Sequence, residues 1–458
     1  MVGQGWLTGL RAVAEISLVI GLLYVPQARS ADLLEVFRLA RDNDPTLAGE
    51  HYQLQASEQS VPEATSALLP VLTANSQVDR TGGDVTYTGS PTSSRQYNSV
   101  IWTVQLTVPL LRPGSIQNLR EARVSVDQAR TRYALAEQDL VLRVAQAYFD
   151  ILVAEESLSA AEAEVRAMQE QGTVASKSYQ KGVVSVTDVD EATTRAELAL
   201  SGQLAASADL ESKRAELEKI IGPLPSSLDG LAKGSLALAT NLDSSEEWAR
   251  RASQNSLKVV GLESAVQIAG LEVKKARMLR LPSVDAIASY GRNYSSGNNT
   301  NPFDYGTNAY VKQAGVQFNL PLLDGGGMHA QVAEAMAKER KARYDLEASR
   351  REAAADAREA YQGVLKGVAQ VKALGAAIEA SERAVKGSRA GYRMGIRINS
   401  DVLDTQRERY AAQRDWAKAR YDTLIQLLKL KAAAGVLQIS DLTAINSMLG
   451  SEDVAGPN

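Results

Sequence analysis

The sequence predicts a tandem-repeat protein of long α-helices and four β-strands, which fits an all-α coiled-coil barrel joined to a transmembrane β-barrel. Three observations lead to this prediction: long tracts rich in Ala, Leu, Glu, Arg and Gln, four segments in which apolar and polar residues alternate, and a motif that occurs twice. The composition favours helices, and an alternation of period two marks strands with one apolar face. A repeated motif indicates a duplicated structural unit.

The duplication is read from several matching stretches. YQKGVVSVTDVDEA, which begins at Tyr179, recurs as YRMGIRINSDVLDT, which begins at Tyr392, 213 positions later. Other stretches repeat in the same order at this spacing, among them LEKIIG, which ends at Gly222, and LKAAAG, which ends at Gly435. The chain is therefore predicted to contain two copies of one supersecondary unit.

Residues 1–30 have the pattern of a cleaved export signal. Arg11 precedes the apolar run ISLVIGLLYV, and the small residues of ARS, which ends at Ser30, follow it. We expect cleavage there, with a mature chain that starts near Ala31. A membrane anchor is the alternative, although the run is short for a span. The sequence has no cysteine, so it offers no site for a lipoprotein anchor.

The segments follow the same order in both copies. The first copy is expected to contain a helix over 31–67, β-strands within 68–111, a helical hairpin over 112–221 and an equatorial or linker segment over 222–243. The second is expected to contain a helix over 244–281, strands within 282–323, a helical hairpin over 324–435 and, over 436–458, an equatorial segment with a flexible tail. Pro70 and Pro282 end the first helices because proline cannot continue a helix.

The first helix of each hairpin is unusually long. A helical pattern without proline runs from about Ser115 to Ser178, and again from about His329 to Ala390. At ~1.5 Å per residue such a helix spans on the order of 90 Å. That length exceeds what a globular domain needs, which favours an extended coiled-coil assembly.

The strands predict insertion into a membrane as an oligomer. In VIWTVQLTVPL the even positions from Val100 to Val108 are apolar or aromatic, while the intervening positions are largely polar. Four strands cannot close a barrel, because the smallest barrels need about eight, whereas three chains together supply twelve. Aromatic residues suit the two lipid interfaces. These are Trp102, Tyr290, Tyr310 and Phe318. The alternative is an exported coiled-coil structural or surface protein without channel activity.

The composition argues against several other classes of function. Acids and bases are interspersed, and the net charge is −4, which does not suggest a nucleic-acid partner. Only two histidines are present, His51 and His329, so neither a metal site nor a cofactor is predicted. The sequence contains no P-loop, Rossmann fingerprint or catalytic dyad, so we predict no enzymatic activity, including that of an exported hydrolase.

The repeated motif predicts two tight turns that are each followed by a helix. Gly182 and Gly395 are expected to allow the chain to reverse direction. Thr187 is expected to cap the following helix in the first copy, and Ser400 in the second. The acids of the first turn complement the helix dipole. In an oligomer, Asp401 and Asp404 would also form rings of acids around the axis, which attract cations.

The chain resembles the TolC family of outer-membrane efflux and secretion proteins. The resemblance is carried by ADLLEVFRLARDNDPTL from Ala31, by LPLLDGGG from Leu320, and by GYRMGIRINSDVLDTQRERY from Gly391. It implies a homotrimer in outer-membrane lipid, with a 12-stranded β-barrel and a 12-helix barrel that extends through the periplasm of a Gram-negative bacterium. The implied partners are a periplasmic adaptor and an inner-membrane ABC or RND transporter.

The resemblance also implies roles for individual residues at the periplasmic tip. Asp401 and Asp404 match the family's gating rings of aspartates. Tyr392 and Arg397 match the residues that hold the closed tip against Thr187 and Asp188. The residues of the motifs are more similar to those of the type I secretion branch. The choice between protein export and multidrug efflux stays open.

Overall fold

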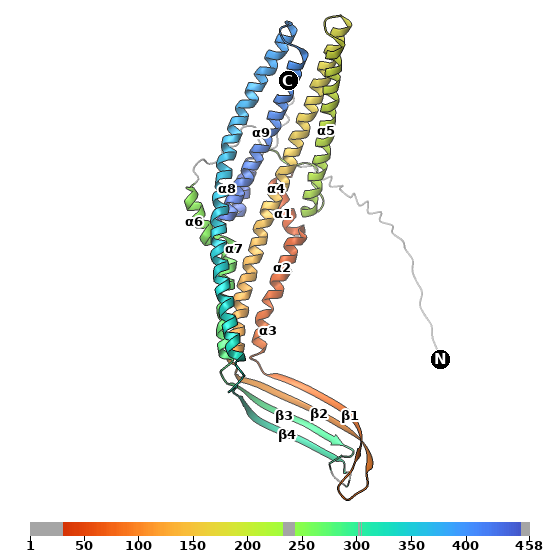
Figure 1. Cartoon of the computed structure of the whole chain (residues 1–458), viewed down its shortest axis with the longest axis vertical. Helices are drawn as coiled ribbons and strands as arrows, with labels where there is room; N and C mark the ends of the chain where they lie inside the picture. Colours follow the sequence, from red (N-terminus) through yellow and green to blue (C-terminus); the bar gives the residue numbers. More distant parts are fainter. Residues whose placement is uncertain (1–30, 232–242, 301–302, 304, 450–458) are drawn as a thin grey trace, which may run out of the picture.

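The computed structural model describes residues 31–231, 243–300, 303 and 305–449. The predicted export signal, half of the predicted linker (232–242) and the end of the predicted tail lie outside the described residues. The described chain is elongated, with a β-sheet at one end and the tips of two helical hairpins at the other (Figure 1). No helix of the described chain is both long and apolar enough to cross a bilayer.

The element order repeats within the chain. The first copy contains α1 (Leu33–Asn43), α2 (Pro45–Glu58), α3 (Ser60–Ser66), β1 (Val71–Val85), β2 (Ser93–Leu111), α4 (Pro113–Gln180) and α5 (Val186–Ile221). The second contains α6 (Ser245–Asn255), α7 (Leu257–Met278), β3 (Ser283–Ser295), β4 (Thr307–Asn319), α8 (Gly327–Arg393) and α9 (Asn399–Ala433), and α10 (Ile439–Asn446) follows it. α4 and α8 run from the sheet to the tips (Figure 1).

The segments predicted as single helices over 31–67 and 244–281 are interrupted, which corrects the prediction. Asp44 has an extended backbone, and its carboxylate accepts a hydrogen bond from the N–H of Thr46 at 3.1 Å, so it caps α2. Pro45 follows and cannot donate to the preceding turn. In the second copy Ser256 leaves the helical conformation, with φ −54° and ψ 131°, and separates α6 from α7.

The sheet has the order β1-β2-β3-β4, and every neighbouring pair is antiparallel. In this register the even-numbered residues of all four strands, up to Val108 in β2, lie on one face. We call this face the apolar sheet face, because its central rows are almost entirely apolar or aromatic. Two such rows are Ala74, Val104, Tyr290 and Lys312, in which only the β4 member is charged, and Leu72, Leu106, Ala288 and Ala314. Within the described chain the outer edges of β1 and β4 pair with no other strand.

The helices share an apolar core around the middle of α4. Tyr148 and Phe149 are fully buried there, and the Phe149 ring lies 5.4 Å from that of Tyr421 in α9. Residues of α1, α5 and α10 complete the cluster. Burial of one large apolar side chain contributes about 1.5–3 kcal/mol, so this core fixes the two hairpins relative to each other.

Tyr148 also binds the start of the described chain and the linker between the two copies. Its hydroxyl donates to the carbonyl of Asp229 at 2.7 Å and lies 3.2 Å from the carbonyl of Ala31. Burial, and then the charge of Asp229, raise the pKa of Tyr148 above its ordinary value, so the hydroxyl keeps its proton. Ala31 and Leu228 form an isolated β-bridge beside it. The start of the described chain is thus bound against the linker between the copies.

Candidate functional site

The two hairpins reverse direction through the same hydrogen-bonded turn. The N–H of Gly182 donates to the carbonyl of Tyr179 at 2.8 Å, and that of Gly395 donates to Tyr392 at 3.0 Å. In both turns the next N–H bonds to the carbonyl five positions back, which completes a Schellman motif. The φ angles of Gly182 and Gly395 are 71° and 73°, a left-handed conformation that strains other residues.

In the first hairpin the acid predicted for the latch is bound within its own turn. Ser185 caps α5, since its hydroxyl accepts from the N–H of Asp188 at 3.3 Å. The Asp188 carboxylate accepts in return from the N–H of Ser185 at 3.0 Å. The cap is therefore Ser185 rather than Thr187, because the helix begins at Val186, two residues earlier than predicted.

In the second hairpin Arg397 likewise lies against its own hairpin. Its guanidinium is 3.9 Å from the carboxylate of Asp401, four residues further along the chain. A side chain at Gly391 would meet the aliphatic part of Arg397, so the glycine leaves room for it. α9 begins at Asn399 after Ile398, so the predicted cap at Ser400 is wrong.

The predicted latch partners have no direct polar contact in this chain. Within the part of the chain that the structure describes, no hydrogen bond or ion pair joins Tyr392 or Arg397 to Thr187 or Asp188. The hairpins are linked at another position near the tips, one to two helical turns from the predicted one.

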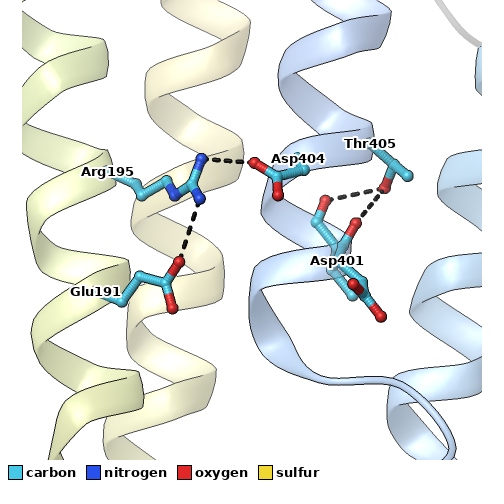
Figure 2. Close-up of polar contacts among 6 residues, drawn as sticks. Glu191, Arg195, Asp401, Asp404 and Thr405 are labelled. Atoms are coloured by element: carbon cyan, nitrogen blue, oxygen red, sulfur yellow. Dashed lines mark hydrogen bonds and ion pairs between the residues drawn. The ribbon is translucent and has the colours of Figure 1, made fainter.

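Arg195 of α5 links the two hairpins (Figure 2). Its guanidinium donates to the carboxylate of Asp404 in α9 at 2.6 Å and to that of Glu191 on its own helix at 3.1 Å. Burial lowers the pKa of Arg195, but the hydrogen bonds and charges of Glu191 and Asp404 raise it by more. The pKa of Arg195 therefore lies above its ordinary value. Arg195 therefore stays charged and partly neutralises Asp404.

The two acids that Arg195 binds are related by the duplication. Glu191 and Asp404 are 213 positions apart, so they are equivalent residues of the two copies. Asp188 and Asp401 are equivalent in the same way. Arg195 lies one helical turn beyond Glu191 and binds the acid of each copy. Only the acid on α9 belongs to the other hairpin, so this pair crosses between repeats.

A buried hydrogen bond between α4 and α9 also connects the two hairpins. The side-chain amide of Gln171 donates to the side-chain oxygen of Asn399 at 2.5 Å, and both residues are buried. An apolar cluster lies nearby. Its buried members are Met168, Ala175, Ala192 and Leu403, from α4, α5 and α9. The described structure thus has its hairpins packed together at the tips.

An open groove lies beside the Arg195 ion pair. It has a volume of about 690 Å³ and is lined by α4, α5 and α9, including Arg407 and Arg414. Glu164 lies in the same groove, where burial raises the pKa of its carboxyl against the opposing effect of the two arginines. Water therefore reaches the edge of the link, and an ion pair of this kind can be broken without unfolding a helix.

The sequence matches a known family over both copies. The profile described as outer membrane efflux protein matches residues 36–223 and 248–436. The chain belongs to the outer membrane efflux protein family. Each matched stretch ends at the close of a hairpin, so the family profile covers the duplicated unit twice.

Individual relatives of this outer membrane efflux protein extend over nearly the whole chain. The alkaline protease secretion protein AprF of Pseudomonas aeruginosa is 28% identical over 93% of this chain and 88% of its own length. The outer membrane protein TolC of Vibrio cholerae is 28% identical over 91% of this chain and 94% of its own. The proteases secretion protein PrtF of Dickeya chrysanthemi is 26% identical over 97% of both chains.

Solved structures share the fold of this outer membrane efflux protein. The CmeC outer membrane channel of Campylobacter jejuni superposes with a TM-score of 0.75, at 16% identity, over 98% of both chains. The outer membrane protein VceC of Vibrio cholerae gives a TM-score of 0.70, at 16% identity, over 88% of this chain and 96% of its own. The predicted fold class, long helices with a four-stranded antiparallel sheet, is confirmed.

Family membership confirms three predictions made from sequence. The resemblance to outer-membrane efflux and secretion proteins is confirmed, as are the location in the outer membrane and the class of function, an export channel. The family consists of channel proteins rather than enzymes. In the described residues no group of three or more His, Asp or Glu side chains could hold a metal ion.

Sequence reasoning missed Arg195 as a member of this site. Its relation to Glu191, four residues earlier on α5, is the spacing of a helical ion pair. The 213-residue offset then makes Asp404 the counterpart of Glu191. The two signals together make Arg195 a candidate partner for both Glu191 and Asp404.

Proposed function

We propose that this outer membrane efflux protein is the trimeric exit duct of a tripartite export system and is gated at its hairpin tips. The observation that carries the proposal is the sheet, which has one apolar face and two unpaired edges. Paired side by side, three such sheets supply twelve strands and leave no open edge. The apolar sheet faces then meet lipid, and the opposite faces surround a polar lumen.

The helices support the same oligomer. α5 exposes Leu198 and Leu204 at 67% and 65%, although both lie on a helix of a long bundle. Exposed leucines of this kind are typical of a surface that another chain covers. In a closed ring of three chains, the free flank of α5 packs against a neighbour and buries them.

The partners and cargo are inferred from the relatives. A passive duct needs an inner-membrane transporter of the ABC or RND class as its energy source, and a periplasmic adaptor to join the two. Two of the relatives, AprF and PrtF, are named as protease secretion proteins. We favour a polypeptide cargo and type I secretion for this reason. Multidrug efflux is the second candidate, since BepC of Brucella suis, 24% identical, is named as an efflux protein.

The gate of the proposed duct consists of the acids at the tips and the link that holds the hairpins together. Asp401 and Asp404 lie at the start of α9, and three chains place them as two rings near the axis. We propose that the pair of Arg195 and Asp404 is the main tie between the hairpins. The latch formed by Tyr392 and Arg397 on Thr187 and Asp188 is a second proposal.

Planar-bilayer recording tests the proposed function. Purified protein that has been cross-linked to establish a trimer should conduct ions, with a small conductance in the closed state. A chain that stays monomeric and soluble without detergent, and that gives no conductance, would support the coiled-coil structural alternative instead.

Neutralising the acids of the tip should reduce the preference of the duct for cations. We expect the double variant Asp401→Asn/Asp404→Asn to lose most of its cation selectivity, with block by a multivalent cation roughly tenfold weaker, because ring charges attract cations at the constriction. Its conductance should also rise, because the variant loses the pair between Arg195 and Asp404. Reversal potentials in a salt gradient measure the selectivity. Asp190→Asn, an exposed acid of α5, is the matched control and should retain both properties. Unchanged selectivity in the double variant would place the constriction elsewhere.

A further inference from the structure

Besides Arg80 of β1, whose guanidinium donates to the side chain of Gln96 at 3.1 Å, the apolar sheet face carries two cations near its far end. Arg292 of β3 lies directly opposite Trp102 of β2 and Tyr310 of β4. Lys312 of β4 lies opposite Tyr290 of β3, in the next row toward the helices. All five side chains belong to the even-numbered face. Two basic residues therefore lie among the aromatic residues of a face whose central rows are otherwise almost entirely apolar or aromatic.

The two cations are held by aromatic rings and an amide. The Arg292 guanidinium lies 5.3 Å from the ring centre of Tyr294 and 5.8 Å from that of Tyr310, and its Nε donates to Asn308 at 2.8 Å. The Lys312 ammonium lies 5.8 Å from the ring centre of Tyr290. Such contacts orient a cation without neutralising it.

The acids of the sheet leave this charge uncompensated. Asp79 and Asp285 are odd-numbered and lie on the opposite face, and Asp285 is paired with Arg112 at 2.9 Å. Asp84 is even-numbered but lies at the turn between β1 and β2, twelve residues beyond Leu72. In the described part of the chain neither Arg292 nor Lys312 forms an ion pair. An anion from outside the chain is needed to balance them.

In the proposed barrel the two cations lie near the level of the lipid headgroups. A basic side chain on the lipid face costs about 2–4 kcal/mol at the midplane and about 0–1 kcal/mol near an interface. From Phe318 to Tyr310 the strand extends roughly 26 Å, or about 20 Å along the barrel axis once a tilt of about 40° is included, so Tyr310 lies near the outer limit of an apolar band about 25 Å tall. Arg292 is opposite Tyr310 and therefore belongs to the outer interface, next to the strand turns.

We infer that Arg292 and Lys312 bind the phosphate of a lipid headgroup in the outer leaflet. The two residues are diagonal neighbours on adjacent strands, with backbones about 7–8 Å apart, so both charges can reach one phosphate. Trp102 and Tyr290, whose rings lie 5.5 Å apart, form the apolar border on which the lipid rests. The inference rests on the outer-membrane location of the proposed duct and is independent of its gate.

Lipid binding by the full trimer tests this inference. The trimer in neutral detergent is titrated with phosphatidic acid, with diacylglycerol of the same acyl chains, and with inorganic phosphate, and bound lipids are counted by native mass spectrometry. We expect phosphatidic acid to bind and to raise the thermal transition, whereas the other two probes do neither. Arg292→Gln/Lys312→Gln should bind phosphatidic acid roughly 25-fold more weakly, about fivefold for each charge removed.

Two further variants separate charge from packing. Arg292→Lys/Lys312→Arg retains both charges and should bind within about threefold of the natural chain. Lys181→Gln removes an exposed cation at the hairpin tip and should bind normally. Equal binding by the double glutamine variant, or equal binding of diacylglycerol, would overturn the inference. Stabilisation by inorganic phosphate as strong as that by the lipid would overturn the assignment to a headgroup. A trimer that binds phosphatidic acid but does not conduct would contradict only the proposed duct.

Discussion

Replacement of Arg195 by Ser should raise the closed-state conductance of the trimer several-fold. The substitution removes the hydrogen bond and ion pair to Asp404, which connect α5 to α9 near the tip. A partly exposed pair contributes about 1 kcal/mol, and three pairs per trimer contribute about 3 kcal/mol. That difference shifts an equilibrium between closed and open tips by roughly 100-fold. Single-channel recording in planar lipid measures the effect directly.

Exchanging the charges of Arg195 and Asp404 distinguishes the loss of their ion pair from other effects of substituting either residue. Arg195→Asp alone places three carboxylates together and should open the tip further. Arg195→Asp/Asp404→Arg restores an opposite pair and should return the conductance toward that of the natural chain. Arg166→Ser, which removes an exposed pair with Glu162 within α4, is the control and should change nothing. Failure of the exchange to close the tip would show that the pair does not act as a tie.

A comparison with Arg397 distinguishes the two proposed ties. Arg397 is 3.9 Å from Asp401 of its own hairpin, so Arg397→Ser breaks no link between hairpins in this structure. We expect Arg397→Ser to raise the conductance less than Arg195→Ser does. The opposite order would favour the latch that the family resemblance implies.

Replacement of Gly435 by Ala should clearly lower the stability of the folded chain. Gly435 follows α9 with a φ of 67°, which strains any residue with a side chain. An added Cβ would also meet the backbone carbonyl of Asn255 at the end of α6. Strain and overlap with backbone together cost at least about 3 kcal/mol. The midpoint of thermal unfolding should fall by roughly 5–10 °C.

A glycine without these constraints provides the control. Gly49 lies within α2, and an added Cβ there meets nothing within 4 Å. Alanine favours a helix over glycine by about 1 kcal/mol, so Gly49→Ala should keep or slightly raise the midpoint. Equal midpoints for Gly435→Ala and the natural chain would mean that α6 and α9 do not approach each other as described.

Much of the fold was predictable because the sequence contains two copies of the same structural unit. The 213-residue offset pairs Gly182 with Gly395 and Gly222 with Gly435, and all four glycines have positive φ in the structure. Alternation on β2 predicted a face that the register of all four strands reproduces. These features depend on local patterns and on repetition, which a single sequence contains.

The breaks within helices and the lengths of strands were harder to predict. The interruption at Asp44 depends on a distant partner, since the Asp44 carboxylate also accepts from Arg143 of α4 at 2.5 Å. β1 extends to Val85, beyond the clear alternation, because its polar end pairs with an equally polar end of β2. Pairing between strands decides such an end, and local composition does not.

The position of the candidate site was predicted from the sequence, but the contacts between its residues were not. The turn glycines and the acids of α9 follow from the repeated motif. The partner of Asp404 depends on how far α5 and α9 are displaced along each other, which local patterns do not specify. Arg195 was missed for this reason, although its spacing from Glu191 was visible.

Reversible cross-linking across the Arg195 pair tests the central claim, that the tie between hairpins keeps the duct closed. The chain has no cysteine, so Arg195→Cys/Asp404→Cys introduces the only thiols, and the unmodified protein is a clean control for a short, cleavable thiol linker. Single-channel conductance is recorded before linking, after linking and after cleavage. We predict high conductance without the linker, low conductance with it, and recovery on cleavage. Conductance that is the same in all three states would contradict the claim.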